Sequence, residues 1–321
     1  MSVLVLKPGM LTTVQDRGRE GSAALGVSRA GAMDDVSLRI ANALVGNEAD
    51  MAAIEITLIG PRLRFERAAT IALTGAECPL RIDGAEAAAW RPVAIDAGAV
   101  IEIGATKRGA RAYLAVAGGF RVDAVLGSAS TDINACLGPF DGHGLKEGNR
   151  LEFGVPQSAP RAKRVRWSVD PRPWFDPDSE YPIRLMPGSH FDALDAASRA
   201  ALFEVEFRIA PDSNRVGFRF DGPRLALSAP IELVSEPVAS GTLQLPPGGQ
   251  AIALMVEAPT IGGYPRIGQI AAVDRQRLAQ RRPGDAVRFA AIDLDDAQTR
   301  YLERERELAR LIETIGERLK S

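Results

Sequence analysis

The side chains that most often carry out catalysis are scarce in this chain of 321 residues. It has only two histidines, His143 and His190, and two cysteines, Cys78 and Cys136. This leaves little room for a zinc site, a disulfide framework or a histidine-based metal centre, so no metal site is predicted. The phosphate-binding G-x-x-x-x-G-K-[ST] loop, the G-x-S-x-G elbow, H-E-x-x-H and a G-x-G-x-x-G loop after a strand are absent from the sequence. Any chemistry must therefore use carboxylates, arginines, hydroxyls and backbone amides.

Four segments combine such polar residues with glycine. They are LTTVQDRGREG (11–21), GVSRAGAMD (26–34), LGSASTDIN (126–134) and EAPTIGGYPRIG (257–268). Small residues let a backbone approach a ligand closely, and hydroxyls and backbone N–H groups can bind anions. Each segment also has an ordinary explanation as a solvated loop, a turn before a capped helix, or a Ser/Thr-rich turn. The residues alone leave both interpretations open.

Short strands must position these segments in the first 154 residues. Alternation and β-branched residues, separated by glycines, predict strands at 53–59, 69–74, 99–103 and 111–117. One helix is expected over 33–46, because its apolar residues fall at helical spacing and Asp34 or Asp35 can cap its start. Both cysteines lie in apolar settings and are expected to be buried thiols.

The second half predicts a similar mixture. A helix over 191–203, opened by Asp192, is followed by strands at 204–209, 216–220, 231–234, 242–245, 251–257 and 285–291. From Asp293 to Leu319 the apolar residues recur at helical spacing and form one stripe, while the charged residues lie on the opposite side of the helix. This pattern predicts a long helix docked on its own domain.

A proline-rich stretch separates the two halves. Residues 155–182 carry six prolines and two tryptophans, so the segment is expected to pack onto a domain surface as a linker. The predicted organisation is a β-rich domain over 1–154, the linker over 155–182, a second β domain over 183–292 and a helix over 293–321. The fold class is mainly β, or β-rich α+β.

Charge and hydropathy exclude other classes of protein. The chain has 39 basic and 41 acidic residues, a net charge of -2, which argues against a nucleic-acid binder. No apolar run approaches the ~18 residues that span a membrane, and the start has too short an apolar stretch for a signal peptide. We therefore expect a cytoplasmic protein with no membrane partner.

The four polar segments also belong to a longer series of matching blocks. LTTVQDRGREG, GVSRAGAMD, ANALVGN, AIEITLIGPRLRF, YLAVAGGF, VLGSASTD and TIGGYPRIGQIAAVD follow one another in the order seen in KipA-like proteins. These are also called allophanate hydrolase subunit 2-like proteins, biotin-dependent carboxyltransferase domain proteins or the C subunit of 5-oxoprolinase. The resemblance runs from about residue 5 to about residue 290.

This resemblance implies a fold, partners and a reaction. It implies two β-rich parts, at least one of them a cyclophilin-like barrel, and a KipI-like (subunit 1) partner. With a third, LamB/YcsF-like subunit, such a complex hydrolyses 5-oxoproline to glutamate with ATP as its co-substrate. Two alternatives stay open. One is a carboxyltransferase subunit of a biotin-dependent urea or amide carboxylase, which alone would involve biotin, and the other is a non-catalytic KipI-binding regulator. Whether the chain also forms a homo-oligomer is left open.

The resemblance also guides the choice of site residues for a small-molecule amide substrate. Glu257, Asp16 and Asp132 are the expected catalytic carboxylates. The expected substrate-binding residues are Gln15, Arg19, Arg29, Asp34, Ser130 and Tyr264. The chain departs from the family pattern at Glu257-Ala258-Pro259-Thr260, at Asn214-Arg215-Val216-Gly217 and at His143. These departures leave the substrate undecided.

Overall fold

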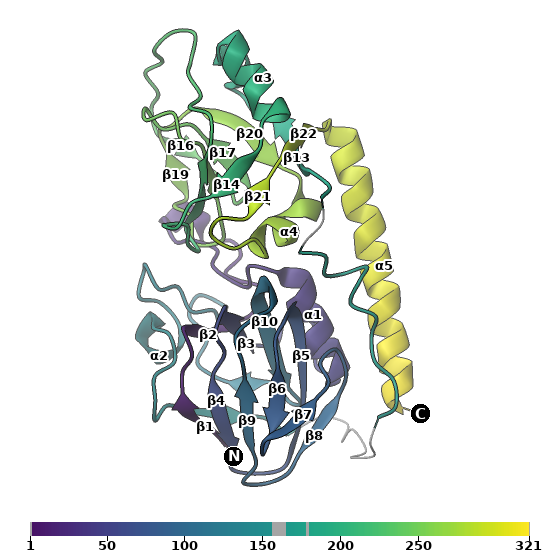
Figure 1. Ribbon diagram of the computed structural model, residues 1–321. Helices are drawn as coiled ribbons and strands as arrows, with labels where there is room; N and C mark the ends of the chain where they lie inside the picture. The colour runs from purple at the N-terminus through teal and green to yellow at the C-terminus, as the bar shows by residue number, and fades with distance from the viewer. Residues whose placement is uncertain (1, 156–164, 178–179, 321) are drawn as a thin grey trace. The chain divides into compact units, whose positions relative to one another are not determined.

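The computed structural model describes residues 2–155, 165–177 and 180–320 (Figure 1). The contacts between residues divide the chain into two compact units. The first unit comprises Met1–Arg19, Ala30–Asp178 and Glu307–Ser321, and the second comprises Glu20–Arg29 and Ser179–Arg306. Parts of the predicted linker, 156–164 and 178–179, lie outside the described residues. Helix α5 (Leu294–Lys320) contributes residues to both units.

The first unit contains two antiparallel sheets. The larger has the order β11-β12-β1-β4-β9-β6-β7 and the smaller the order β2-β3-β10-β5-β8. The strands of the larger sheet are β1 (Ser2–Lys7), β4 (Arg62–Phe65), β6 (Leu80–Ile82), β7 (Ala85–Ala87), β9 (Val100–Ile103), β11 (Phe120–Arg121) and β12 (Arg150–Phe153). Those of the smaller sheet are β2 (Leu11–Gln15), β3 (Ala53–Thr57), β5 (Ala69–Glu77), β8 (Val93–Ile95) and β10 (Arg108–Val116).

Strand alternation gives the smaller sheet two different faces. On one face Ile54 and Ile56 of β3 join a core that also contains Val3 and Val5 of β1, so the two sheets pack against each other. Because successive side chains of a strand point to opposite faces, Glu55 lies on the other face. This second face is covered by helix α1 (Asp35–Leu44).

The second apolar cluster of this unit lies around α1. It combines buried residues of α1 with Tyr113 and Ala115 of β10 and with Leu308 and Ile315 of α5. Trp167 and Trp174 pack against the same cluster, as expected for a proline-rich segment held onto a domain surface. A short helix, α2 (Pro139–Gly142), lies outside both sheets.

The second unit is built around one sheet of eight strands, in the order β21-β14-β15-β18-β17-β20-β13-β22. Its strands are β13 (Ile183–Pro187), β14 (Phe207–Ile209), β15 (Gly217–Asp221), β17 (Thr242–Gln244), β18 (Ile252–Leu254), β20 (Arg266–Ile270), β21 (Ala286–Val287) and β22 (Phe289–Ala291). The two outermost strands, β21 and β22, are separated only by Arg288, so the sheet curls into a nearly closed barrel. A separate ribbon pairs β16 (Glu236–Pro237) with β19 (Ile261–Gly262). Helices α3 (Ala196–Glu204) and α4 (Arg275–Ala279) complete the unit.

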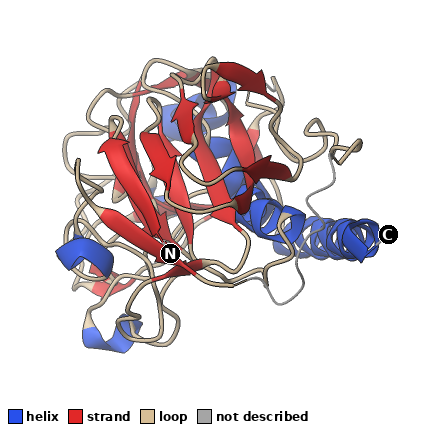
Figure 2. Ribbon diagram, turned by 90° about the horizontal axis from the view of Figure 1, so that it is seen from below, coloured by secondary structure: helices blue, strands red, loops and turns tan. Residues whose placement is uncertain are grey.

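The predicted fold class is confirmed: strands dominate both units, one sheet is barrel-like, and a long helix ends the chain (Figure 2). The helix expected over 33–46 is also present, with Asp34 as its N-cap. The stripe of α5 is only partly buried, since Leu308 is 0% exposed while Leu294 is 58% exposed.

Three local predictions are wrong. The single helix over 191–203 is instead a 3-10 turn over Phe191–Ala193 followed by α3, because Asp195 is extended and accepts a hydrogen bond from the Ser198 N–H at 2.6 Å. Residues 231–234 form no strand, and Val234 is 85% exposed. Cys136 is exposed rather than buried.

Candidate functional site

A row of buried polar side chains crosses the smaller sheet of the first unit on the face that α1 covers. Thr13 is in register with Glu55, Glu55 with Tyr113, and Tyr113 with Thr74. Residues in register on adjacent strands share a face, so these four side chains form a line across β2, β3, β10 and β5. None is more than 1% exposed. Such groups must find hydrogen bonds within the protein, with water or with a ligand.

Most of this row holds the start of α1. The Tyr113 hydroxyl donates to Glu55 Oε2 at 2.7 Å, and the backbone N–H of Met33 donates to the same oxygen at 2.8 Å. The Asp34 N–H donates to the Tyr113 oxygen at 2.7 Å, and Thr74 Oγ1 donates to the Ser37 carbonyl at 2.7 Å. Burial raises the pKa of the Tyr113 phenol well above its ordinary value, and the charges of Glu55 and Asp34 raise it further.

Asp34, an expected substrate-binding residue, is engaged at the helix start. Its carboxylate accepts hydrogen bonds from the Ser37 N–H at 3.0 Å and from the Ser37 hydroxyl at 2.7 Å. These bonds satisfy one of the backbone donors left open in the first turn of a helix. The side chain therefore has a structural task whatever else it contacts.

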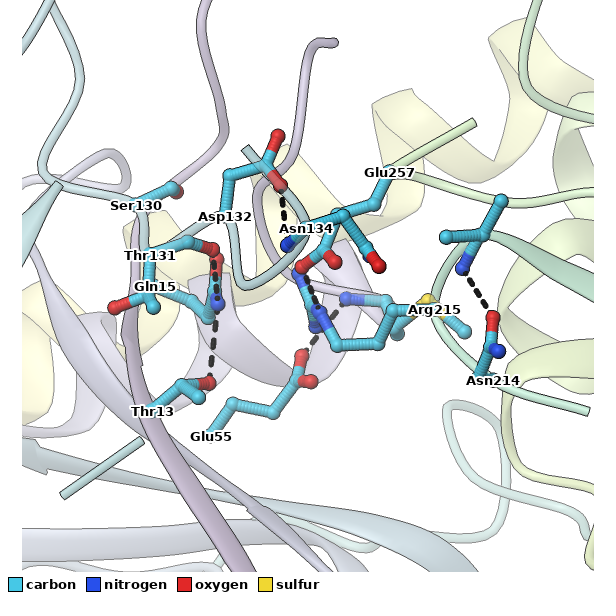
Figure 3. Close-up of polar contacts among 12 residues, drawn as sticks. Thr13, Gln15, Glu55, Ser130, Thr131, Asp132, Asn134, Asn214, Arg215 and Glu257 are labelled. Atoms are coloured by element: carbon cyan, nitrogen blue, oxygen red, sulfur yellow. Dashed lines mark hydrogen bonds and ion pairs between the residues drawn. The ribbon is translucent and has the colours of Figure 1, made fainter. Parts of the chain in front are cut away.

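Gln15 is the last residue of β2, and its side chain is hydrogen-bonded to Thr13 and Thr131 (Figure 3). Its Nε2 donates to Thr13 Oγ1 and to the Thr131 carbonyl, both at 3.0 Å, so both of its N–H groups are used. Its Oε1 is buried and has no hydrogen-bond partner among the described residues. The hydroxyl of Thr131 is likewise buried without a partner. Two such atoms in one cluster indicate a place where a ligand or water completes the hydrogen bonding.

Asp16 holds the loop that carries Thr131 in place through hydrogen bonds to its carboxylate. Its carboxylate accepts hydrogen bonds from the Gly18 N–H at 2.7 Å, the Ala129 N–H at 2.6 Å, the Ser128 hydroxyl at 2.6 Å and the Ser130 hydroxyl. Three of these donors converge on Oδ1 and one on Oδ2, so most of the hydrogen-bonding capacity of the carboxylate is used within the loop. The geometry thus fits a positioning role for Asp16, and its predicted catalytic role stays a prediction.

Arg19 and Asp132 hold the same loop. Arg19 donates to the Val125 carbonyl at 3.2 Å and to the Ser130 carbonyl. Asp132 Oδ1 accepts hydrogen bonds from the N–H groups of Asn134 at 3.1 Å and Ala135 at 3.0 Å, and the first of these is drawn in Figure 3. The structure therefore brings five of the predicted residues together in one cluster. We call it the Gln15 cluster: Gln15, Asp16, Arg19, Ser130, Asp132 and, in addition, Thr13 and Thr131.

The second unit holds the other three predicted residues. Glu257 follows β18 and makes an ion pair with Arg215, whose Nε donates to Glu257 Oε1. The two side chains are 1% and 4% exposed. Tyr264 is 47% exposed, and Arg29 makes an exposed ion pair with Glu20 at 3.2 Å.

Six residues of the row, the Gln15 cluster and the Glu257 ion pair were not among the predicted site residues: Thr13, Glu55, Thr74, Tyr113, Thr131 and Arg215. Glu55 did carry a signal, because it is the one charged residue in the apolar strand AIEITLI. Thr131 lay within a predicted segment, and Arg215 within a noted departure from the family pattern. The pairing of Arg215 with Glu257, across 42 residues, has no signal in a single sequence.

The described residues also bear on metal, membrane and thiol chemistry. They contain no group of three or more His, Cys, Asp or Glu placed to hold a metal ion. Within the same ranges, none of the helices is long and apolar enough to cross a membrane. Burial raises the pKa of the Cys78 thiol to about 12, so this thiol does not form a nucleophilic thiolate at neutral pH.

Comparisons with known proteins place this geometry in a family. Residues 25–291 match the family model described as carboxyltransferase domain, subdomain A and B. The chain is 38% identical over 310 residues to the C subunit of 5-oxoprolinase from Escherichia coli (strain K12), covering 93% of this chain and 96% of that protein. It is 35% identical to the C subunit of 5-oxoprolinase from Haemophilus influenzae (strain ATCC 51907 / DSM 11121 / KW20 / Rd) over 285 residues, covering 89% of each.

A solved structure agrees with the sequence comparisons. The crystal structure of the K. lactis urea amidolyase superposes with a TM-score of 0.86 at 26% identity, covering 98% of this chain. This chain spans 20% of the length of that one, so the match concerns one part of a much larger protein. Taken together, the matches show that this chain belongs to the carboxyltransferase domain, subdomain A and B family.

Proposed function

We propose that this chain is one subunit of an ATP-dependent amidohydrolase of the 5-oxoprolinase type, which opens 5-oxoproline to glutamate. The observation that carries the proposal is the buried Gln15 Oε1, an acceptor without a partner among the described residues. Two relatives named as the C subunit of 5-oxoprolinase, matched over 96% and 89% of their lengths, support the same assignment. A KipI-like subunit would share the site, and a third, LamB/YcsF-like subunit would complete the complex.

The substrate chemistry follows from the two open atoms. An acceptor such as Gln15 Oε1 suits the N–H of a secondary amide, and a hydroxyl such as that of Thr131 can donate to a carbonyl oxygen. A lactam carries both groups. A buried polar atom that only the right ligand satisfies gives strong discrimination against analogues lacking the group. Gln15 would thus bind the substrate amide, while Asp16, Arg19 and Ser130 keep the loop in place.

The carboxylates Glu257 and Asp132 remain the candidates for proton transfer. Opening an amide requires a group that activates the attacking water and one that protonates the leaving nitrogen. Arg29, Asp34 and Tyr264 would contact the substrate in the assembled complex. The pairing of Glu257 with Arg215 means that Arg215 would orient this carboxylate.

ATP and biotin place different demands on the Gln15 cluster. A phosphate needs donors, whereas the open atom of Gln15 is an acceptor, so the cluster fits an amide and no ATP contact is assigned to it. Hydrolysis of ATP bound to the complex would supply the free energy for opening the lactam. The ureido group of biotin also has N–H and C=O groups, so it would fit the Gln15 cluster if the chain is a carboxyltransferase subunit instead.

Reconstitution with the cognate partner subunits tests the proposal. We expect 5-oxoproline turnover that depends on ATP, and we expect Gln15→Leu to raise KM at least tenfold, because it removes the amide acceptor. Gln250→Leu is the matched control, since the amide of Gln250 is bonded to Asp221 in the second unit. Absence of turnover with all partners present would reject the proposal. Binding of a KipI-like protein without any turnover would favour the regulator.

The carboxyltransferase alternative is favoured by the match to the K. lactis urea amidolyase over 98% of this chain. It predicts transfer of a carboxyl group from a carboxybiotin carrier protein to urea or another amide. Incubation of the chain and its partner with a labelled carboxybiotin carrier and urea separates the two functions, because this reaction needs no 5-oxoproline.

A further inference from the structure

A second buried side-chain amide with one atom that finds no hydrogen-bond partner among the described residues lies in the second unit, on the outer face of its barrel-like sheet. On β17, Leu243 is 0% exposed and points into the core, so Thr242 and Gln244 point to the other face. Gln244 is in register with Arg266 of β20, and Thr242 with Gln269. The register shifts between Leu243 and Gln244, which puts Arg266 and Gln269, three residues apart on β20, opposite the two polar residues of β17.

Three of these four side chains have partners. Thr242 Oγ1 donates to Gln269 Oε1 at 2.9 Å, and Gln269 Nε2 donates to the Ser240 carbonyl at 3.0 Å. Arg266 makes an ion pair with Glu236 of the β16–β19 ribbon. Gln244 is only 5% exposed, and its Nε2 is buried with no hydrogen-bond partner among the described residues. A buried amide N–H left open in this way destabilises the folded protein unless something binds it.

The β16–β19 ribbon covers this amide, and a glycine makes the cover possible. A Cβ on Gly262 would lie 2.6 Å from Gln244 Nε2 and 3.5 Å from Val238 Cγ1. A Cβ on the next residue, Gly263, would meet nothing closer than Ser235 Oγ at 3.4 Å. Any side chain at Gly262 would therefore push against the amide, while one at Gly263 would not. Ile261 and Tyr264, on either side of the two glycines, are exposed.

We infer that the Gln244 amide is a binding site for a carbonyl or carboxylate oxygen of a small ligand, with the β16–β19 ribbon as its cover. An N–H donor in a buried setting selects an acceptor atom, and lactams and carboxylates carry such atoms. A ligand reaches Nε2 when the ribbon shifts, and the adjacent glycines Gly262 and Gly263 give this segment its freedom. The inference rests on the proposed function only for the choice of 5-oxoproline as one of its probes.

NMR of the side-chain amides tests this directly on the full chain. The Gln244 Nε2 signals are assigned as those missing from the spectrum of Gln244→Met, a variant of similar size without the donor. The chain is then titrated separately with 5-oxoproline, with pyrrolidin-2-one, which has the lactam carbonyl alone, and with acetate, which has the carboxylate alone. We expect a saturable shift of these signals with at least one probe, and the responding probe identifies the kind of oxygen bound. Absence of a saturable shift with all three overturns the inference.

Two glycine variants provide the matched comparison. Gly262→Ala should displace the amide and abolish the shift, whereas Gly263→Ala should keep it. Gln244→Met should weaken binding of the responding probe about tenfold by calorimetry, the value of one hydrogen bond. Binding that is unchanged in both Gly262→Ala and Gln244→Met overturns the inference. If the complex turns over 5-oxoproline but no probe shifts the signals, this inference fails and the proposed function stands. If a probe shifts the signals but the complex shows no turnover of 5-oxoproline, this inference stands and the proposed function fails.

Discussion

Arg215 and Glu257 are bound to each other twice inside the second unit. The guanidinium Nε of Arg215 donates to Oε1 of Glu257, and the backbone N–H of Glu257 donates to the Arg215 carbonyl at 3.0 Å. The pair connects the segment before β15 with the segment after β18, two strands that are neighbours in the sheet. With side chains only 4% and 1% exposed, each charge is compensated mainly by nearby protein groups rather than by water.

Removing one member of this pair should be costly. We expect Arg215→Met to lower the free energy of unfolding by about 3–5 kcal/mol, because it leaves a buried carboxylate without its guanidinium. Urea unfolding followed by circular dichroism measures this. The double variant Arg215→Met/Glu257→Met should recover much of the loss, since it removes both charges. A loss below about 1 kcal/mol in the single variant would contradict the role given to the pair.

Asp16 should matter for stability, because its carboxylate gathers the loop around Ser128 and Ser130. Asp16→Asn replaces one acceptor oxygen with an N–H₂ group that faces donors. We expect a loss of about 2–3 kcal/mol, typical of hydrogen bonds to a charged group. The measurement is a urea unfolding curve, with Asp123→Asn on an exposed residue as the control, expected to change stability by less than about 0.5 kcal/mol. Equal stability of the two variants would show that the four hydrogen bonds of Asp16 contribute little.

The buried Tyr113 should make the stability of the folded protein depend on pH in alkaline solution. Burial raises its pKa above the ordinary value of 10. The unfolded chain therefore releases the phenolic proton at a lower pH than the folded protein does. Stability is fully present below about pH 10 and falls as the pH rises above that value. Tyr113→Phe should be less stable at pH 8 by about 1–3 kcal/mol, because Glu55 and the Asp34 N–H lose a partner.

The pH dependence separates this effect from general alkaline damage. Urea midpoints are measured between pH 8 and pH 11 for the wild type and Tyr113→Phe. The wild-type curve should fall more steeply above pH 10, so that the difference between the two proteins narrows. Tyr181→Phe, on a side chain 78% exposed, is the control and should follow the wild type. Parallel curves for wild type and Tyr113→Phe would contradict the prediction.

The sequence could predict the elements because their signals are local. Asp34 caps α1 as expected, since capping depends on a side chain and a backbone N–H three residues apart. The sequence could not predict the hydrogen bond from Gln15 to Thr131, because the two residues are 116 positions apart and only the folded arrangement of the strands brings them together. The helix expected over 191–203 was wrong for a local reason: Asp195 offered a better cap than Asp192 within the same apolar pattern. Register across strands, rather than residue type, decides which polar groups end without a partner.

The buried Asp274 should make the stability of the second unit depend on pH in acidic solution. Its side chain is fully buried, and Oδ1 and Oδ2 each accept a hydrogen bond from the Arg184 guanidinium at 2.8 Å. Arg277 adds a contact to Oδ1 at 3.0 Å. Burial alone would raise the pKa of this carboxyl, but the hydrogen bonds from Arg184 and the charge of Arg277 lower it on balance. The folded state therefore holds the ionised form more strongly than the unfolded state does.

The sign of the effect follows from this shift. The stabilisation is present above the unfolded pKa of about 4 and is lost as the pH falls through the lower pKa of the folded protein. At pH 7, Asp274→Asn should cost about 3 kcal/mol, because two guanidinium groups lose their carboxylate. At pH 3 the difference from wild type should shrink, since the wild type is itself losing this stabilisation. Asp212→Asn is the matched control: Asp212 pairs with Arg219 at 3.0 Å, but both side chains are largely exposed. Such a pair contributes about 0–1 kcal/mol at either pH, so a similar loss in both variants would contradict the argument from burial.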